Sequence, residues 1–284
     1  MSVLRPMRRE DALLVHELAT RTFADLEERL HEPSSPPQPA EPALVRFHQL
    51  LERDPGGAWV AERDGQLIGA AVAIDRDGLW GLSLLVVDPA HQSGGLGREL
   101  LSRSLAYGEG GRRGAVILAS PDSRALRAYS RAGFAPHPSL HARGRPKGVD
   151  APAGVRAGGA GDRELIERVD LAVRGAAHGG DIDALLRAGC RLLVAEERGY
   201  AVVGRGSVRL LAAFDDDAAA DLLRAALASV PAGEEFSVDW VTAHQGWAIA
   251  PVLDAGLPLR PAGAVFVRGD VGPLRPYIPS GAYL

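Results

Sequence analysis

The sequence is nearly free of cysteine and lysine. Its 284 residues contain one cysteine, Cys190, which excludes an intrachain disulfide and a thiolate metal cluster within one chain. The surrounding run AGCRLLVA is apolar and favours a buried, inert thiol, so no metal site is expected. Lys147 is the one lysine among 32 basic residues, a bias typical of a GC-rich bacterial genome.

Long apolar runs and a strong charge of one sign are also absent. The net charge of −4 gives no reason to expect a nucleic-acid partner. No apolar run reaches the length of a membrane span, and the start MSVLRPMRREDALL has charges where a signal peptide needs an apolar core. We therefore expect a cytoplasmic protein without membrane association. Its 46% of hydrophobic residues are enough for a packed core.

Periodicity and turn signals predict an α/β protein with a mixed sheet and two domains. Residues 1–147 are expected to contain a strand, two helices, three strands, a helix, a strand, a helix and a strand, with a hairpin turn at Asp64-Gly65. The stretch 143–161 is rich in glycine and proline and indicates a domain junction. Residues 148–284 then repeat the same order of elements.

Two proline-rich stretches are expected to lie outside this pattern. HEPSSPPQPAEP, residues 31–42, cannot be a regular helix or a central strand, so it is interpreted as a loop. The loop is either a surface connection or a mobile lip over an acceptor site. The final run PLRPYIPSGAYL is amphipathic and is expected to dock on the surface.

The stretch Leu84–Leu101, LLVVDPAHQSGGLGRELL, combines a strand, a glycine-rich turn and the start of a helix. The first turn of a helix carries N–H groups without partners and the positive end of the helix dipole. Glycine lets a phosphate group approach the backbone because no Cβ is in the way. The stretch therefore predicts an anion site, and we interpret the anion as a pyrophosphate.

The first half resembles the GCN5-related N-acetyltransferase (GNAT) family. The spacing of Gln92, Gly95 and Gly97 after Val87-Asp88-Pro89 is similar to the family's acyl-CoA signature, and ALRAYSRAGF at 125–134 is similar to its fourth-helix pattern. Both blocks lie in the family's order of elements. The resemblance covers nearly all of residues 1–145 and implies two tandem GNAT-like domains, the first binding acetyl-CoA.

The resemblance also implies site residues. The pantetheine arm of acetyl-CoA would bind main-chain groups of Leu85, Val86 and Val87, and Tyr129 would act as general acid toward the thiolate. Asp122 stands where the family often has an asparagine that contacts pantetheine, and aspartate can accept but not donate a hydrogen bond there. The N–H groups expected to hold the pyrophosphate belong to Gln92, Ser93, Gly94, Gly95, Leu96, Gly97 and Arg98.

A general base is not evident. The strand before the loop, LWGLSLLVV, has no carboxylate, although the family often places one there. Asp88 follows it but precedes Pro89, so it is interpreted as a turn residue. A base acting through water, or an amine that arrives neutral, is equally compatible with the sequence. Candidates by location alone are Glu27, Glu28, His31, His137 and His141.

The second half resembles the same fold with its signature lost. The counterpart of the glycine loop, AFDDDAAAD at 213–221, has no glycine, and its carboxylates would repel a pyrophosphate. We interpret Asp215–Asp217 as helix N-capping residues. This half is expected to be structural or to shape the acceptor pocket, although helix caps and core packing explain the same side chains. The residues concerned are His178, Asp181, Asp183, Asp239 and Trp240.

These observations predict an acetyl-CoA-dependent N-acetyltransferase that acts on a small-molecule amine. The alternative is a catalytically silent acyl-CoA-binding sensor or regulatory protein, which the missing strand carboxylate keeps open. A Rossmann dinucleotide protein fits less well, because the first glycine of its fingerprint is missing and the preceding strands form hairpins. A tandem chain contains an internal pseudo-dimer, so we expect a monomer, with a homodimer as the alternative.

Overall fold

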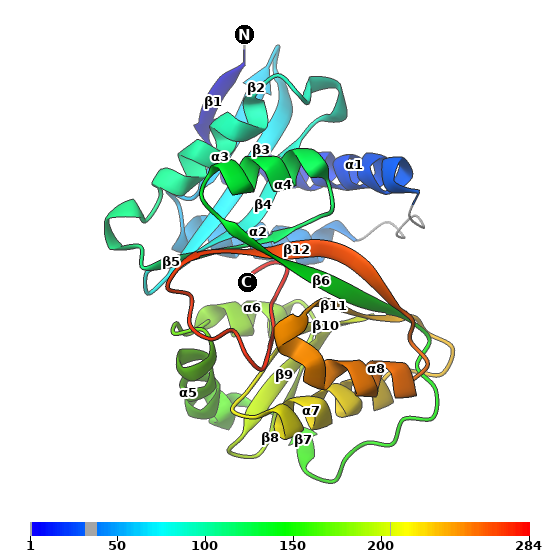
Figure 1. The fold of residues 1–284 in the computed structure, drawn as a ribbon. Coiled ribbons are helices and arrows are strands. Elements are labelled where there is room, and N and C mark those ends of the chain that lie inside the picture. Colours follow the sequence, from blue (N-terminus) through cyan, green and yellow to red (C-terminus); the bar gives the residue numbers. More distant parts are fainter. Residues whose placement is uncertain (1, 32–38, 205) are drawn as a thin grey trace. The chain divides into compact units, whose positions relative to one another are not determined.

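The computed structural model describes residues 2–31, 39–204 and 206–284. The chain forms two compact units, the first unit Met1–Arg112 and the second unit Arg113–Leu284. The order of elements expected for each half of the sequence is confirmed (Figure 1).

The first unit contains an antiparallel sheet in the order β1-β2-β3-β4. Its elements are β1 (Val3–Pro6), α1 (Ala12–Leu30), α2 (Ala40–Arg53), β2 (Ala58–Arg63), β3 (Gln66–Arg76), β4 (Leu79–Val87) and α3 (Leu96–Ala106), with short 3-10 turns η1 (Arg9–Asp11), η2 (Pro89–His91) and η3 (Glu109–Gly111).

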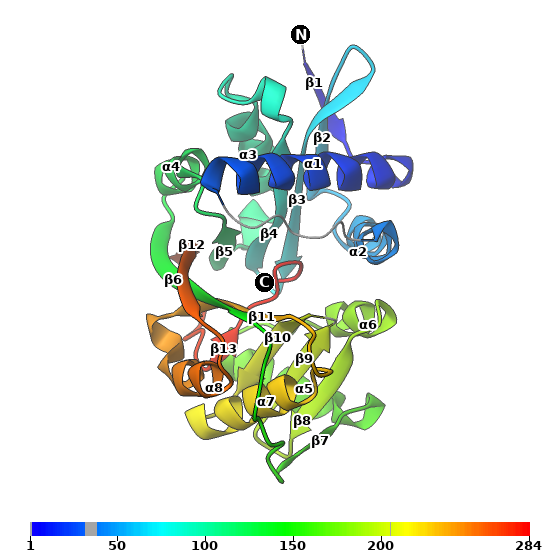
Figure 2. The same cartoon turned by 90° about the vertical axis from the view of Figure 1, so that its right-hand side faces the viewer.

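Helices α1 and α3 cover opposite faces of this sheet (Figure 2). Their apolar residues recur at helical spacing: Val15, Leu18 and Leu26 are buried on α1, and Leu96 and Leu100 are buried on α3. The strands β3 and β4 are thus packed between the two helices.

A buried ion pair fixes the other end of the first unit. Arg76 at the end of β3 lies 2.9 Å from both carboxylate oxygens of Asp54, which follows α2. The hydroxyl of Tyr107, just after α3, donates to Asp54 at 3.1 Å. Burial and the Asp54 charge raise the pKa of Tyr107 to about 12, so the hydroxyl keeps its proton. The contacts connect α2, β3 and α3.

The second unit contains a longer sheet in the order β5-β12-β6-β11-β10-β9-β8-β7, and β13 pairs with β10. Its strands are β5 (Gly114–Ala119), β6 (Ala135–Gly144), β7 (Val155–Ala157), β8 (Arg191–Ala195), β9 (Gly199–Gly204), β10 (Ser207–Ala213), β11 (Phe236–Thr242), β12 (Leu259–Gly269) and β13 (Tyr277–Ile278). Its helices are α4 (Ser123–Arg131), α5 (Arg163–Val173), α6 (Gly180–Arg187), α7 (Asp216–Ala228) and α8 (Ile249–Asp254), with turns η4 (Ala160–Asp162) and η5 (Ala243–Ala248).

Strand β12, from the end of the sequence, lies between β5 and β6, which come from the first half. Strand β6 in turn pairs with β11 of the second half. The fit is tight, because a Cβ on Gly263 of β12 would lie 1.6 Å from the carbonyl oxygen of Ala119 on β5. The compact units therefore divide at Arg112, while the division into repeats 1–147 and 148–284 stays a prediction about the order of elements.

Two expectations from the sequence need correction. The final segment does not rest on the surface: Tyr277, Ile278, Tyr283 and Leu284 are all buried, and β13 is part of the sheet. Alternating proline and apolar residues gave no strand signal there.

The second correction concerns α2, which begins at Ala40 rather than after Pro42. Proline is tolerated there because a first-turn N–H has no helical partner. Residues 32–38 of the expected loop lie outside the described part of the chain.

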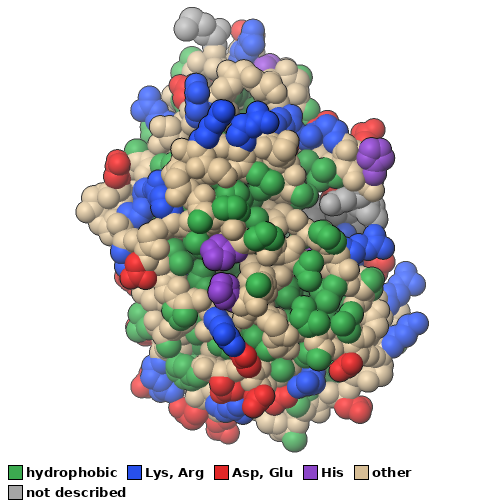
Figure 3. Space-filling view, viewed as in Figure 1, with side chains coloured by type: hydrophobic (Ala, Val, Ile, Leu, Met, Phe, Trp, Pro, Cys, Tyr) green, Lys and Arg blue, Asp and Glu red, His purple; other side chains and the backbone are tan. Residues whose placement is uncertain are grey.

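Within the described ranges, no helix is both long and apolar enough to cross a membrane. The face drawn in Figure 3 carries basic, acidic and apolar side chains side by side, in keeping with the small net charge.

The Asp54–Arg76 pair leads to a stability prediction. Asp54→Asn should lower the free energy of unfolding by about 3–5 kcal/mol, because it removes the negative charge that pairs with the buried Arg76 guanidinium. Urea denaturation of the purified protein measures this. Asp64→Asn, the same exchange at an exposed hairpin position, should change stability by less than about 0.5 kcal/mol. Equal stabilities of the two variants would contradict the role given to the pair.

Candidate active site

The glycine loop of the first unit ends in an uncapped helix. Gly95 is the N-cap residue of α3, with φ +92°, and no side chain caps this end of the helix. Ser93, Gly94 and Gly95 are exposed, whereas Leu96 is buried in the core beside Leu100. The side chain of Leu96 therefore anchors the first turn, and the backbone N–H groups of this turn are free of a side-chain cap, as an anion site requires.

Backbone conformation requires glycine at one position of this loop but not at two others. Gly95 requires glycine for its backbone, because φ is in the left-handed region. The other two do not: a Cβ on Gly94 would meet no atom within 4 Å, and one on Gly97 would lie 3.6 Å from Val87, an ordinary contact. Packing within the protein therefore does not explain Gly94 and Gly97.

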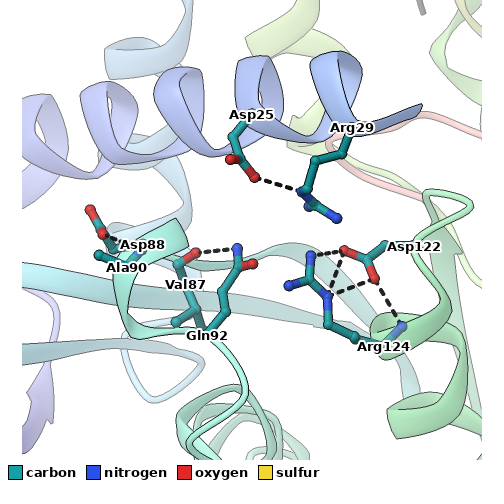
Figure 4. A network of polar contacts seen from close by, with 8 residues as sticks. All are labelled: Asp25, Arg29, Val87, Asp88, Ala90, Gln92, Asp122 and Arg124. Carbon is teal, nitrogen blue, oxygen red and sulfur yellow. Dashed lines mark hydrogen bonds and ion pairs between the residues drawn. The ribbon is translucent and has the colours of Figure 1, made fainter. Parts of the chain in front are cut away.

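Gln92 and Asp88 hold the loop on the end of β4. The Gln92 side-chain amide donates to the carbonyl oxygen of Val87 at 2.9 Å (Figure 4). Asp88 caps η2 by accepting from the Ala90 N–H at 3.0 Å and pairs with Arg21 at 3.1 Å. Burial alone would raise the pKa of Asp88, but the hydrogen bonds from Ala90 and Arg21 lower it. Asp88 is thus the turn residue expected from the sequence and a weak base.

The backbone groups of β4 alternate between the side that faces β3 and the opposite side. The Asp88 N–H donates to Ile68 of β3 at 2.9 Å. Because backbone groups alternate along a strand, the N–H and C=O groups of Leu85 and Val87 point away from β3, and Val86 points toward it. The Val87 carbonyl on this side already accepts the bond from Gln92. Leu85–Val87 as a pantetheine contact stays a prediction.

A β-bulge in β4 brings in a residue that the sequence did not single out. Leu84 pairs with Val72 and Leu82 with Ala73, so Ser83 is the extra residue. The Ser83 hydroxyl is buried and has no hydrogen-bond partner in the described part of the chain. An unpaired buried hydroxyl costs about 1–3 kcal/mol, and such groups often belong to sites that receive a ligand or water.

Trp80 and Leu85 lie on either side of the bulge and both pack toward α3, Trp80 by donating its indole N–H to Ser104. Residues five positions apart lie on opposite faces of a regular strand, so their common side shows that the bulge at Ser83 reverses the alternation of side chains along β4. Thr22 of α1 carries another buried hydroxyl without a partner among the described residues. No sequence motif marks the two hydroxyls, because a bulge is set by strand register.

Helix α4 in the second unit carries Tyr129. The side chain is buried, and its ring meets that of Phe266 on β12 edge to face, with 5.6 Å between centroids. Burial first, and then the charge of Asp122, raise the pKa of Tyr129 above its ordinary value. No hydrogen bond of its hydroxyl is formed within the described residues, so the phenol is protonated and available as a donor.

Asp122 caps α4 instead of being held ready for a ligand. Its carboxylate accepts from the Arg124 N–H at 2.8 Å and pairs with the Arg124 guanidinium at 2.6 Å (Figure 4). The contact of Asp122 with pantetheine expected from the resemblance stays a prediction.

The candidate bases are spread over both units. Glu27 and Glu28 lie in the last turn of α1, which ends at His31, and the other two lie on β6. His137 and His141 are both half-buried, and the ring of His137 lies 5.6 Å from that of His244.

Helix α7 corresponds to α3 in the second half, and a side chain caps its N-terminus. Asp215 accepts from the Ala218 N–H at 2.9 Å and pairs with Arg198 at 2.5 Å, as N-capping predicts. The hydrogen bond from Arg198 outweighs the effect of burial and lowers the pKa of Asp215, which therefore stays charged at this helix end.

Structural roles account for most of the suggested acceptor-pocket residues. His178 and Asp181 are fully buried, and Asp183 pairs with exposed Arg163 at 2.8 Å. Asp239 accepts from Ser237 at 3.2 Å, and Trp240 lies in a β-bulge with φ +63°. Within the described ranges no group of metal-ligating side chains forms a metal site.

Comparison with known proteins agrees with this geometry. Residues 21–134 match the model of the acetyltransferase (GNAT) family. A mycothiol acetyltransferase of Streptomyces avermitilis is 38% identical over 88 residues, which are 30% of this chain and only 29% of that relative's length.

Solved structures extend the likeness to the whole chain. A candidate acetyltransferase of Pyrococcus horikoshii superposes with a TM-score of 0.83 at 18% identity, covering 100% of this chain and 96% of the other. A GCN5-related N-acetyltransferase of Sphaerobacter thermophilus gives 0.61 at 16% identity, covering 95% and 96%. A tandem GNAT protein from the clavulanic acid biosynthesis pathway gives 0.61 at 14% identity, covering 95% and 99%.

The chain therefore has the mixed α/β fold of these solved structures, with a glycine loop at a helix N-terminus in its first unit. Residues 21–134 carry the sequence pattern of the acetyltransferase (GNAT) family.

Proposed function

We propose that this protein is an acetyl-CoA-dependent N-acetyltransferase that acts on the amine of a small molecule. The observation that carries the proposal is the loop before α3, where Gly94 and Gly97 serve no packing need and the helix end has no side-chain cap. The match of residues 21–134 to the GNAT family supports acetyl-CoA as the anion's source, and the name of the Streptomyces relative supports acetyl transfer.

The glycine loop and the end of β4 would bind different parts of acetyl-CoA. The N–H groups from Gln92 to Arg98 would hold the pyrophosphate, and the outward groups of Leu85 and Val87 would hold the pantetheine arm. Acetyl-CoA supplies an activated acetyl group as a thioester. In the transfer a C–N bond to the amine forms, the C–S bond breaks, the amine loses a proton and the thiolate gains one.

Tyr129 is the proposed proton donor to the thiolate. The family resemblance supports this role, and the raised pKa suits it, since the phenol keeps its proton at neutral pH. The amine proton needs another acceptor. β4 has no carboxylate, and Asp88 is paired with Arg21, so we propose that Ser83 orients the amine or the water that takes its proton.

The missing carboxylate on β4 also supports a second candidate function, an acyl-CoA-binding sensor without catalysis. One measurement, the release of CoA in the presence of amines, distinguishes the two functions. A sensor binds acetyl-CoA with no amine-stimulated release of CoA from a broad panel of amines, whereas a transferase releases CoA with at least one of them.

The loop assignment predicts how donor binding responds to glycine substitutions. Gly97→Ala should fold normally, since the new methyl meets only Val87, yet it should weaken acetyl-CoA binding about tenfold or more by blocking phosphate approach. Gly95→Glu and Gly97→Glu should abolish binding through charge repulsion. Isothermal titration calorimetry measures this, with Gly110→Ala, an exposed glycine outside the loop, as the matched control. Undiminished binding by both glutamate variants would refute the assignment.

Tyr129→Phe tests the proton donor. It should leave acetyl-CoA affinity nearly unchanged and lower kcat by about 10²–10⁴, the usual contribution of a positioned acid. Because the pKa of Tyr129 is raised, its deprotonation should cause no loss of kcat in the wild type below about pH 10. Stopped assays of CoA release across pH give both quantities. A wild-type kcat retained in Tyr129→Phe would remove Tyr129 from the mechanism.

Ser83→Ala separates a site role from a structural one. Loss of an unpaired buried hydroxyl should leave the free energy of unfolding equal or higher, while kcat/KM for the amine should fall about tenfold or more. Ser104→Ala is the matched control: its hydroxyl is buried but bonded to Leu100 at 3.0 Å, so stability should fall and kcat/KM should not. An unchanged kcat/KM in Ser83→Ala would show that the hydroxyl does not serve the site.

A further inference from the structure

In the second unit, strands β10 and β11 run parallel but separate soon after they start. Their pairing is limited to Ser207 opposite Ser237, with one further bond from the Ser237 N–H to Gly206 at 2.8 Å. Beyond that point β13 lies against both strands and pairs antiparallel with β10 (Figure 2). The opening between the two strands is thus filled by the C-terminal segment, residues 274–284.

Strand β10 corresponds to β4 in the repeated order of elements. Each is the third of three consecutive antiparallel strands and precedes the helix whose N-terminus was discussed above, α3 or α7. The two strands are aligned on their last residues, Val87 and Ala213, because the next amide in each, that of Asp88 or Phe214, donates to the neighbouring strand or the turn beside it. Leu85–Val87 therefore corresponds to 211–213.

The C-terminal segment bonds to those corresponding residues. Ile278 pairs with Leu211 and Tyr277 with Ala212. The next amide, that of Ala213, donates to the carbonyl oxygen of Pro276 at 3.3 Å. An extended peptide thus lies along the backbone edge that corresponds to the proposed pantetheine edge.

The N-terminus of α7 carries acidic side chains, whereas no side chain caps the N-terminus of α3. Arg275 of the C-terminal segment lies 3.1 Å from Asp216 in the first turn of α7, and Asp215 caps the same turn. Where the first unit offers uncapped N–H groups to an anion, the second offers carboxylates that hold a cation from its own chain.

Buried side chains hold the C-terminal segment in place. Gln245 donates to the carbonyl of Leu274 at 2.8 Å and accepts from the Tyr277 N–H at 2.9 Å. His178, held by Asp170 at 2.9 Å, lies 3.0 Å from the carbonyl oxygen of Leu284. Gln245 and His178 are fully or almost fully buried, so loss of the segment would leave the side-chain amide of Gln245 and one ring nitrogen of His178 buried without these hydrogen bonds.

We propose that the ligand of the second half's cleft is the chain's own C-terminal segment, which takes there the place that acetyl-CoA takes in the first half. The description of the cleft as a former donor site rests on the proposed function. The cleft accepts an extended peptide strand with a cationic side chain, and each chain binds a single acetyl-CoA.

Hydrogen-exchange mass spectrometry of the full chain, with and without saturating acetyl-CoA, tests this. Peptides covering residues 207–214 and 274–284 should exchange slowly in both conditions, and acetyl-CoA should protect residues 92–98 instead. Fast exchange of 274–284 in the free protein, or a change there on adding acetyl-CoA, would overturn the proposal. If acetyl-CoA protects no peptide, the proposed function fails, while slow exchange at 207–214 and 274–284 still upholds occupancy by the segment.

A variant that loosens the segment sharpens the test. Gln245→Ala should raise exchange at 274–284 and 207–214 about tenfold or more and leave protection of 92–98 by acetyl-CoA unchanged. His244→Ala, at the exposed neighbouring position, is the matched control and should change neither. Native mass spectrometry of the wild type should show one acetyl-CoA per chain. Two per chain, or unchanged exchange at 207–214 in Gln245→Ala, would contradict the proposal.

Discussion

The insertion of β12 between β5 and β6 is the constraint on which the second unit depends. This strand pairs with β5 on one side and β6 on the other, so the segment β5-α4-β6 cannot form its sheet until the end of the chain arrives. Phe266 of β12 packs against Tyr129, and Arg268 donates to Ala132 at the end of α4 at 2.8 Å. The tyrosine proposed as proton donor is thus held by a strand from the other half of the sequence.

The N-termini of α3 and α7 differ in whether a side chain caps the helix. At α3 the N-cap is Gly95, which has no side chain to satisfy the first-turn N–H groups. At α7 the N-cap is Asp215, whose carboxylate satisfies one of them and places a negative charge at the positive end of the dipole. An N-cap side chain stabilises a helix by about 1 kcal/mol. The N-terminus of α3 lacks that stabilisation, because no side chain caps it.

Much of the fold and part of the candidate site follow from local signals. Period-2 runs and the Asp64-Gly65 turn predicted the β2–β3 hairpin, and the glycine spacing predicted the turn between β4 and α3. Turn chemistry likewise identified Asp88 and Asp215 as caps, because capping depends on residues two or three positions away. The buried hydroxyl of Ser83 could not be predicted, because it results from a register shift between β3 and β4. Nor could the burial of Tyr277, whose strand partner lies more than sixty residues earlier in the chain.

By itself, the sequence determined the order of elements in each half, the resemblance to the GNAT family and the open end of α3, since each depends on spacing within a short window. Only the tertiary structure decided that the halves exchange strands, that the C-terminal segment enters the sheet beside β10, and that Tyr129 packs on Phe266. The reason is physical: strand pairing between distant segments is selected by edge complementarity and shared burial, and alternation along a strand does not encode which edge it will meet.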